Sequence, residues 1–190
     1  MIVKDLGNNM IIHCSKKLLD ILPKSVKDNF IPNSECPPPT LYDWEGSVIR
    51  FGRYRALVFI NCITRYTIFL YRPMAKDLES LPDLLEYAIG EIMQSDCFTP
   101  EVINRYTGNL GEASYSGTSG KKQAGQLSMT CETAVQFYNH LLDPKMMIQY
   151  ALSDNANNCP GRIRTKKYEF PLLVMQEKMD ELMDQPVSFH

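Results

Sequence analysis

The sequence predicts a single α+β domain in which helices pack on an antiparallel or mixed β-sheet. The sheet is predicted by residues 47–71, where runs of β-branched, aromatic and aliphatic residues are separated by turn-like residues. A helix is predicted by residues 80–92, where apolar side chains recur at helical spacing after a capping-box type start. A chain of 190 residues, 44% of them hydrophobic, can bury one core but is short for two ordinary domains.

The chain before this sheet is predicted to hold a strand, a short helix and a loop. Residues 10–13 form an apolar run typical of a strand, so the ordered domain is expected to begin there and residues 1–9 to be an N-terminal extension. Ser15 is a suitable N-cap for a helix that Pro23 would end. Residues 24–40 are rich in Lys, Asn and Pro, which predicts a loop.

Two runs at the centre of the sheet, residues 56–60 and 66–71, are apolar almost without alternation, as expected for central strands covered on both faces. Asn61 follows the first run, and a buried asparagine needs partners for its amide. With Thr64 it would close the turn between the two strands by side-chain to backbone hydrogen bonds. A ligand contact by these two residues is the alternative. For Trp44, the only tryptophan, we favour a buried anchor over a ligand-stacking role.

More elements are predicted after the sheet. Thr99 begins a second helix, and residues 112–118 are a weak strand candidate. Residues 117–122 are polar and glycine-rich, which predicts a turn or flexible loop. Ser128 or Thr130 is expected to cap the helix that follows.

The C-terminal part is predicted to be an appendage to the domain. Residues 153–167 are polar with almost no core-forming side chains, which predicts a mobile loop. Residues 172–183 are amphipathic and rich in Met, so they would either dock on the domain or bind a protein partner. We therefore expect an α+β domain over residues 10–152, followed by a polar loop and an amphipathic helix over residues 153–190.

Composition narrows the protein class. The net charge of −2 excludes the globally basic signature of many nucleic-acid binders, although a local basic patch remains compatible with it. Six cysteines are scattered singly, which predicts free thiols in a reducing cytoplasm. The N-terminus lacks the apolar core of a signal peptide and no run reaches membrane-spanning length, so a cytoplasmic protein without membrane association is expected. No CxxC, HxxxH or HExxH spacing occurs, so neither a metal site nor a cofactor is predicted.

The arginines of the predicted sheet lead to the most specific prediction about function. Five of the eight arginines lie between residues 46 and 75, where no acidic residue occurs: Arg50, Arg53, Arg55, Arg65 and Arg72. Arginine suits bidentate contact with phosphate or carboxylate, which favours an anion-binding surface. The alternative is that these arginines solvate the sheet and form ion pairs with acidic residues elsewhere.

Two other places contain candidate site residues. Lys121 and Lys122 follow a glycine-rich stretch before a helix, where free backbone amides attract anions. Tyr115 stands where a P-loop requires Gly, and Lys122 stands where it requires Ser or Thr, so a P-loop is excluded. Two alternatives are left: a weaker anion contact by Lys121 and Lys122, or a solvated loop.

His13 is the candidate catalytic residue. Its neighbour Cys14 points to the opposite face of the strand, so the two cannot act as a dyad.

A scattered set of residues resembles a known family. The set comprises residues 10–19, M-I-I-H-C-S-K-K-L-L, then Trp44, V-F-I-N at residues 58–61, Thr64 and Tyr66, and finally Thr118, Lys121, Gly125 and Leu127. It resembles an uncharacterised bacterial family of small proteins or domains of unknown function, sometimes found near plasmid-type genes. The resemblance covers about residues 10–145, and I-H-C-S-K-K-L-L is its most specific part. Where the family has Arg after the Thr of the late loop, this chain has Lys121, which keeps the charge but loses the planar fork. The resemblance to this family therefore suggests which residues form a site but does not suggest a reaction.

Three function hypotheses follow from these residues. The first is a non-catalytic binding protein of bacterial or mobile-element origin that contacts an anionic partner such as nucleic acid. Its candidate contacts are Lys17, Trp44, Arg53, Arg55, Asn61, Thr64, Lys121 and Lys122. The alternative is an enzyme acting on nucleic acid or nucleotide, with His13 as acid or base. The third is a protein-interaction module that uses residues 172–183. Convergence on one concave site favours an enzyme or a ligand site, whereas a flat spread of arginines favours an extended polyanion. The residues concerned are His13, Lys17, Trp44, Arg53, Asn61 and Lys121.

Overall fold

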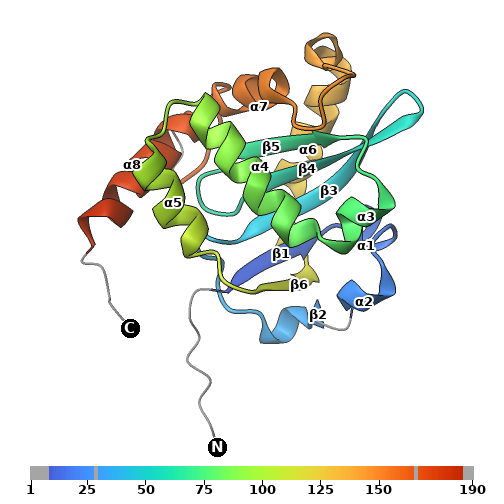
Figure 1. The fold of residues 1–190 in the computed structure, drawn as a ribbon, viewed down its shortest axis with the longest axis horizontal. Helices are drawn as coiled ribbons and strands as arrows, with labels where there is room; N and C mark the ends of the chain where they lie inside the picture. Colours follow the sequence, from blue (N-terminus) through green and yellow to red (C-terminus); the bar gives the residue numbers. More distant parts are fainter. Residues whose placement is uncertain (1–8, 28–29, 165–166, 186–190) are drawn as a thin grey trace, which may run out of the picture.

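A computed structural model describes residues 9–27, 30–164 and 167–185 of the chain (Figure 1). One mixed sheet has the strand order β2-β6-β1-β3-β4-β5. Its strands are β1 (Met10–Cys14), β2 (Phe30–Ile31), β3 (Trp44–Phe51), β4 (Tyr54–Asn61), β5 (Thr67–Tyr71) and β6 (Ala113–Gly117). β1 runs parallel to both β3 and β6, β2 runs parallel to β6, and β3, β4 and β5 are antiparallel. The predicted single α+β domain is confirmed.

Helices cover both faces of this sheet. They are α1 (Lys16–Leu19), α2 (Lys24–Lys27), α3 (Ala75–Glu79), α4 (Leu81–Ser95), α5 (Pro100–Gly108), α6 (Lys121–Phe137), α7 (Tyr150–Asn157) and α8 (Pro171–Asp184). Figure 1 shows α4 and α5 in front of the sheet and α6 behind it. The apolar residues form a larger core on the α4 face and a smaller one on the α6 face. β4 contributes Leu57 and Phe59 to the first and Val58 and Ile60 to the second, which explains its apolar run without alternation.

Helix α1 lies on the α4 face, beside the part of β3 that β1 does not reach. The pairing of β1 with β3 ends at Cys14 and Gly46. Leu18 of α1 is completely buried and packs over Gly46, where an added Cβ would lie 2.6 Å from the Leu18 side chain. Ser15 accepts a hydrogen bond from the Leu18 backbone, as expected for an N-cap. A glycine at position 46 therefore lets α1 approach the sheet closely.

Parts of three predicted loops have regular structure instead, and the first is residues 24–40, which contain helix α2 and strand β2. Helix α6 begins at Lys121, well before the expected caps Ser128 and Thr130, so Lys121 and Lys122 form its exposed first turn rather than a loop. Helix α7 (Tyr150–Asn157) continues into the segment expected to be mobile and includes its first residues, 153–157. Local composition predicted the helix after Ser128 but missed the first turns of α6 and the part of α7 beyond Leu152, because the contacts that stabilise these parts are made with distant segments.

Helix α7 binds the edge of the sheet through polar side chains. Ser153 Oγ accepts a hydrogen bond of 3.1 Å from the Phe69 backbone N–H, and Asn157 Oδ1 accepts one of 2.7 Å from that of Thr67. Both acceptor residues are completely buried. Edge strand β5 would otherwise leave these N–H groups unpaired. The polar residues that suggested a loop are thus the partners of a strand edge.

Helix α8 docks on the domain, which was one of the two alternatives for residues 172–183. Met175, Met179 and Leu182 belong to the larger core, and Thr64 Oγ1 donates to the sulfur of Met175 at 3.5 Å. The apolar face of α8 is therefore occupied by the protein's own core.

Candidate functional site

The carboxyl ends of strands β1 and β6 define a crevice. These strands are parallel neighbours, yet the chain leaves β1 toward α1 on one face and leaves β6 toward α6 on the other. In open α/β sheets, ligands bind outside the carboxyl ends of strands at such a switch point. Two cavities lie here, one of about 520 Å³ and one of about 250 Å³, and Thr118 lines both.

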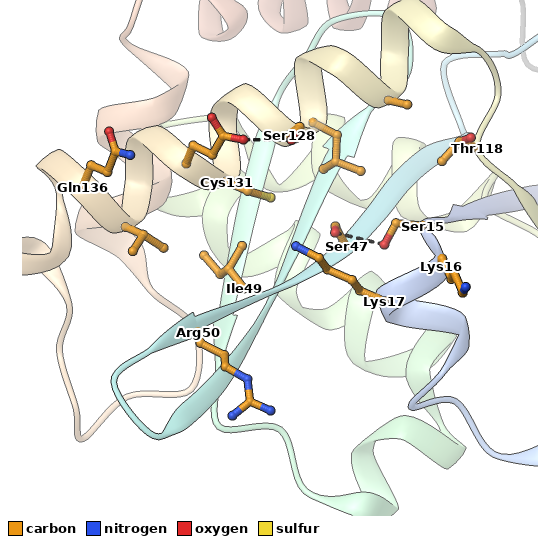
Figure 2. A pocket seen from close by; sticks show the side chains of 14 residues that line it. Ser15, Lys16, Lys17, Ser47, Ile49, Arg50, Thr118, Ser128, Cys131 and Gln136 are labelled. Carbon is orange, nitrogen blue, oxygen red and sulfur yellow. Dashed lines mark hydrogen bonds between the residues drawn. The ribbon is translucent and has the colours of Figure 1, made fainter.

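The larger cavity is a groove between α1, β3 and α6, which we call the α1–α6 groove (Figure 2). Its lining residues are Ser15, Lys16, Lys17, Ser47, Ile49, Arg50, Thr118, Ala124, Leu127, Ser128, Cys131, Glu132, Val135 and Gln136. Figure 2 shows the Lys17 side chain extended across β3 with its amine directed into the groove. Ser15 Oγ donates to Ser47 Oγ at 2.9 Å on the groove wall, and a dashed line in Figure 2 marks this bond.

The electrostatics of the groove favour an anion over a nucleophilic reaction. Lys16, Lys17 and Arg50 are exposed and have no ion pair among the described residues. Glu132 is the acidic residue of the lining and accepts a hydrogen bond from Ser128 at 3.1 Å. Burial raises the pKa of the Cys131 thiol to about 12, and the nearby Lys17 only partly opposes this shift. Cys131 therefore stays protonated at neutral pH and is a poor nucleophile.

Four of the five sheet arginines gather at the β3–β4 turn, in a cluster we call the arginine hairpin: Arg50, Arg53, Arg55 and Arg72. Arg50 and Arg55 are cross-strand partners, and Arg72 joins them because its backbone N–H donates to the Arg55 carbonyl at 2.9 Å. The guanidinium carbons of Arg53 and Arg72 lie 4.8 and 4.4 Å from the centroid of the Tyr54 ring. All four are exposed, and within the described part of the chain none forms an ion pair. Arg50 also lines the α1–α6 groove, so hairpin and groove are continuous.

The fifth arginine, Arg65, lies at the opposite end of β4, in the turn before β5. It is half-buried and its guanidinium donates to Thr130 Oγ1 at 3.4 Å. The sheet arginines thus divide into an exposed cluster and one separate residue.

Other predicted site residues are buried. Trp44, Asn61 and Thr64 are completely buried, so they have no surface to offer a partner. Asn61 Oδ1 accepts hydrogen bonds from the backbone N–H groups of Ile63 and Thr64, as the structural interpretation of this turn predicted. Lys121 is exposed but does not line the groove. The candidates therefore do not converge on one concave site.

His13 lies beside the smaller cavity, together with Asn33, Cys36 and the loop after β6. Its side chain is 1% exposed. Nδ1 lies 3.1 Å from the Gly117 carbonyl oxygen, and because a carbonyl can only accept, Nδ1 is the donor of this hydrogen bond. Nε2 is buried and has no hydrogen-bond partner among the described residues.

Glu45, the parallel register partner of His13, is a residue that the sequence analysis missed. The backbone N–H of Ser119 donates to Glu45 Oε1 at 2.7 Å, and the Ser119 hydroxyl donates to the same oxygen. Burial raises the pKa of the Glu45 carboxyl, while the bonds from Ser119 and the proximity of His13 oppose that shift. Glu45 could not be paired with His13 from the sequence, because their proximity depends on a register between strands 32 residues apart.

Within the described ranges, no group of three or more His, Cys, Asp or Glu side chains is arranged to hold a metal ion. None of the helices in that part of the chain is long and apolar enough to cross a membrane. All six cysteines are free thiols.

Comparison with known proteins identifies a family. A family model described as a domain of unknown function, DUF6933, matches residues 11–173. No curated protein and no solved structure matches the chain.

Proposed function

Because the chain belongs to the DUF6933 family, whose function is unknown, we propose a function from its surface charge: it binds a phosphate-bearing polyanion, single-stranded nucleic acid, along the arginine hairpin and the α1–α6 groove. One observation carries this proposal. The cations around the groove are all exposed and, in the described residues, lack carboxylate partners: Lys16, Lys17, Arg50, Arg53, Arg55 and Arg72. The bacterial or mobile-element origin implied by the resemblance remains a prediction.

The cluster creates a local positive field on a chain whose net charge is −2. Arg50 belongs to both the groove and the hairpin, so a strand entering the groove beside Lys17 would leave it over Arg50. Each guanidinium group can bind two oxygens of a phosphate at once. The Tyr54 ring holds the guanidinium groups of Arg53 and Arg72 by cation–π contact.

The aromatic residues of the sheet favour contact with phosphates over contact with bases. The Tyr54 ring already lies against Arg53 and Arg72, while Tyr66 and Tyr71 are buried. Stacking of bases on aromatic rings is thus limited on this surface. Phosphate contacts carry little sequence information, so we expect strong salt dependence and weak sequence preference.

The double variant Arg53→Ala, Arg55→Ala is expected to bind single-stranded DNA less tightly and with a weaker dependence on salt. For a single strand each lost phosphate contact lowers the slope of log K against log salt by about 0.7, so two contacts correspond to about 1.4. Fluorescence anisotropy of a labelled oligonucleotide at several salt concentrations measures this slope.

A matched control removes two cations near α8. In the wild type, Arg164 pairs with Glu169 and Glu177, and Lys178 pairs with Glu181. The variant Arg164→Ala, Lys178→Ala loses the same formal charge and should keep the wild-type slope. Absence of binding at low salt, or equal slopes for the two double variants, would contradict the proposal.

An enzyme acting on nucleotide or nucleic acid is a second candidate. It is favoured by His13 Nε2, which has no hydrogen-bond partner in the described part of the chain and lies beside a cavity of about 250 Å³. If His13 is a general acid or base, His13→Gln should lower turnover by about 10²- to 10⁴-fold and remove one limb of the pH profile. The control is His140→Gln, which alters an exposed histidine in the segment Asn139–Leu141. Equal turnover by the two variants would leave His13 as a structural residue.

A further inference from the structure

We infer that a separate cavity on the α6 face of the sheet binds a small apolar carboxylate, with Arg65 as its counter-charge. The cavity has a volume of about 180 Å³ and lies between β5, α6 and α7. It shares no lining residue with the α1–α6 groove, so this inference does not depend on the proposed polyanion site.

The cavity walls are mainly apolar. Phe69, Ala134 and Leu152 are almost completely buried, and Met129, Tyr138, Ala156, Pro160 and Pro171 also line the cavity. A cavity of about 150 Å³ holds a benzene ring, so this one has room for roughly eight non-hydrogen atoms. That size fits a short hydrocarbon chain or an aromatic ring and is too small for a nucleotide.

Arg65 is the charged residue of this lining, and its charge is poorly compensated. A guanidinium has five N–H donors, but among the residues that the structure describes this side chain makes one bond, at 3.4 Å, to the neutral hydroxyl of Thr130. Burial lowers the pKa of Arg65, which reports the cost of desolvating its charge. Within the described residues no carboxylate forms an ion pair with it. A half-buried charge in apolar surroundings is stabilised by an opposite charge with matching geometry, and a carboxylate provides two oxygens for the guanidinium fork.

The backbone conformation of Arg65 also indicates that its side chain has a role. Its φ angle is 63°, in the left-handed region that favours glycine or asparagine. The conformation is maintained by the turn, since the Arg65 N–H donates to the Asn61 carbonyl at 3.0 Å. An arginine at such a position is disfavoured locally, so its side chain is expected to contribute a function that glycine could not.

A carboxylate fits this cavity better than a phosphate. A phosphate monoester carries up to two charges and three terminal oxygens that need donors. Here the lining has one guanidinium, that of Arg65, and its hydroxyl-bearing residues are neutral: Thr67, Thr130, Thr133 and Tyr138. One charge and an apolar body match a monocarboxylic acid.

Three probes of similar size test this inference on the full chain: hexanoate, 1-hexanol and hexylamine. Titration by NMR or calorimetry is expected to show that hexanoate binds, that hexanol binds at least about tenfold more weakly, and that hexylamine does not bind. Arg65→Gln should remove the preference of hexanoate over hexanol. Arg72→Gln, which removes an exposed arginine that also has a positive φ angle, should leave it unchanged.

Two further variants separate folding from binding. Arg65→Gly relieves the left-handed conformation, so it should unfold at the wild-type temperature or above and yet lose hexanoate binding. Ala156→Leu retains Arg65 but fills the cavity, and it should lose binding of both hexanoate and hexanol. No binding of hexanoate at millimolar concentration, equal affinity for hexanol, or full binding by Arg65→Gly would overturn the inference.

Discussion

Deletion of residues 171–190 is expected to abolish cooperative unfolding of the protein. Helix α8 places Val174, Met175, Met179 and Leu182 in buried positions, where each is at most 7% exposed. Burial of a large apolar side chain contributes about 1.5–3 kcal/mol, so four contribute roughly 6–12 kcal/mol. The whole free energy of unfolding of a domain is about 5–15 kcal/mol. Circular dichroism during urea and thermal unfolding would show a shallow, non-cooperative transition.

Point variants on the two faces of α8 provide the control. Met179→Ala should lower the free energy of unfolding by about 2–5 kcal/mol, because it leaves a cavity in the core. Leu173 is 58% exposed, and Leu173→Ala should change it by less than about 0.5 kcal/mol. A truncated chain with a sharp transition would instead support the boundary after Leu152 predicted from the sequence.

Asn61→Ala is expected to destabilise the protein by about 2–6 kcal/mol, since it leaves the backbone N–H groups of Ile63 and Thr64 without an acceptor and each such group costs about 1–3 kcal/mol. The Asn61 side chain is completely buried, and its Nδ2 donates to the Leu41 carbonyl at 2.7 Å. Its Oδ1 accepts from the backbone N–H groups of Ile63 and Thr64 and from the Thr64 hydroxyl. The urea midpoint should fall while the m-value stays constant.

Two other substitutions sharpen this test. Asn61→Asp has nearly the shape of Asn61 and keeps an acceptor for the turn, but it loses the donor to the Leu41 carbonyl. We therefore expect Asn61→Asp to be less stable than the wild type despite its similar shape. Asn104→Ala, at an exposed position of α5, should change the free energy of unfolding by less than about 0.5 kcal/mol. A loss below about 1 kcal/mol for Asn61→Ala would mean that water replaces the side chain in this turn.

The sequence alone determined the elements whose chemistry is local. The apolar runs predicted β4 and β5 because both faces of these strands are covered, and the spacing of Leu85, Ala88, Ile89 and Ile92 predicted α4. The turn bonds of Asn61 to Thr64 were also predictable, because donor and acceptor lie three residues apart. Such features depend on the periodicity of apolar residues and on contacts between residues close together in the chain, and both can be read directly from a sequence.

The tertiary structure decided whatever depends on contacts between distant segments. Ser153 and Asn157 are polar, so composition indicated a loop, yet they form a helix because β5 supplies backbone donors 84 and 90 residues away. His13 and Glu45 lie next to each other because of the register between β1 and β3, which the sequence does not display. The separation of Arg65 from the arginine hairpin follows from the length of β4, since the two lie at opposite ends of that strand. A polar or charged residue reveals its chemistry in the sequence, but its partner, and therefore its role, is set by the fold.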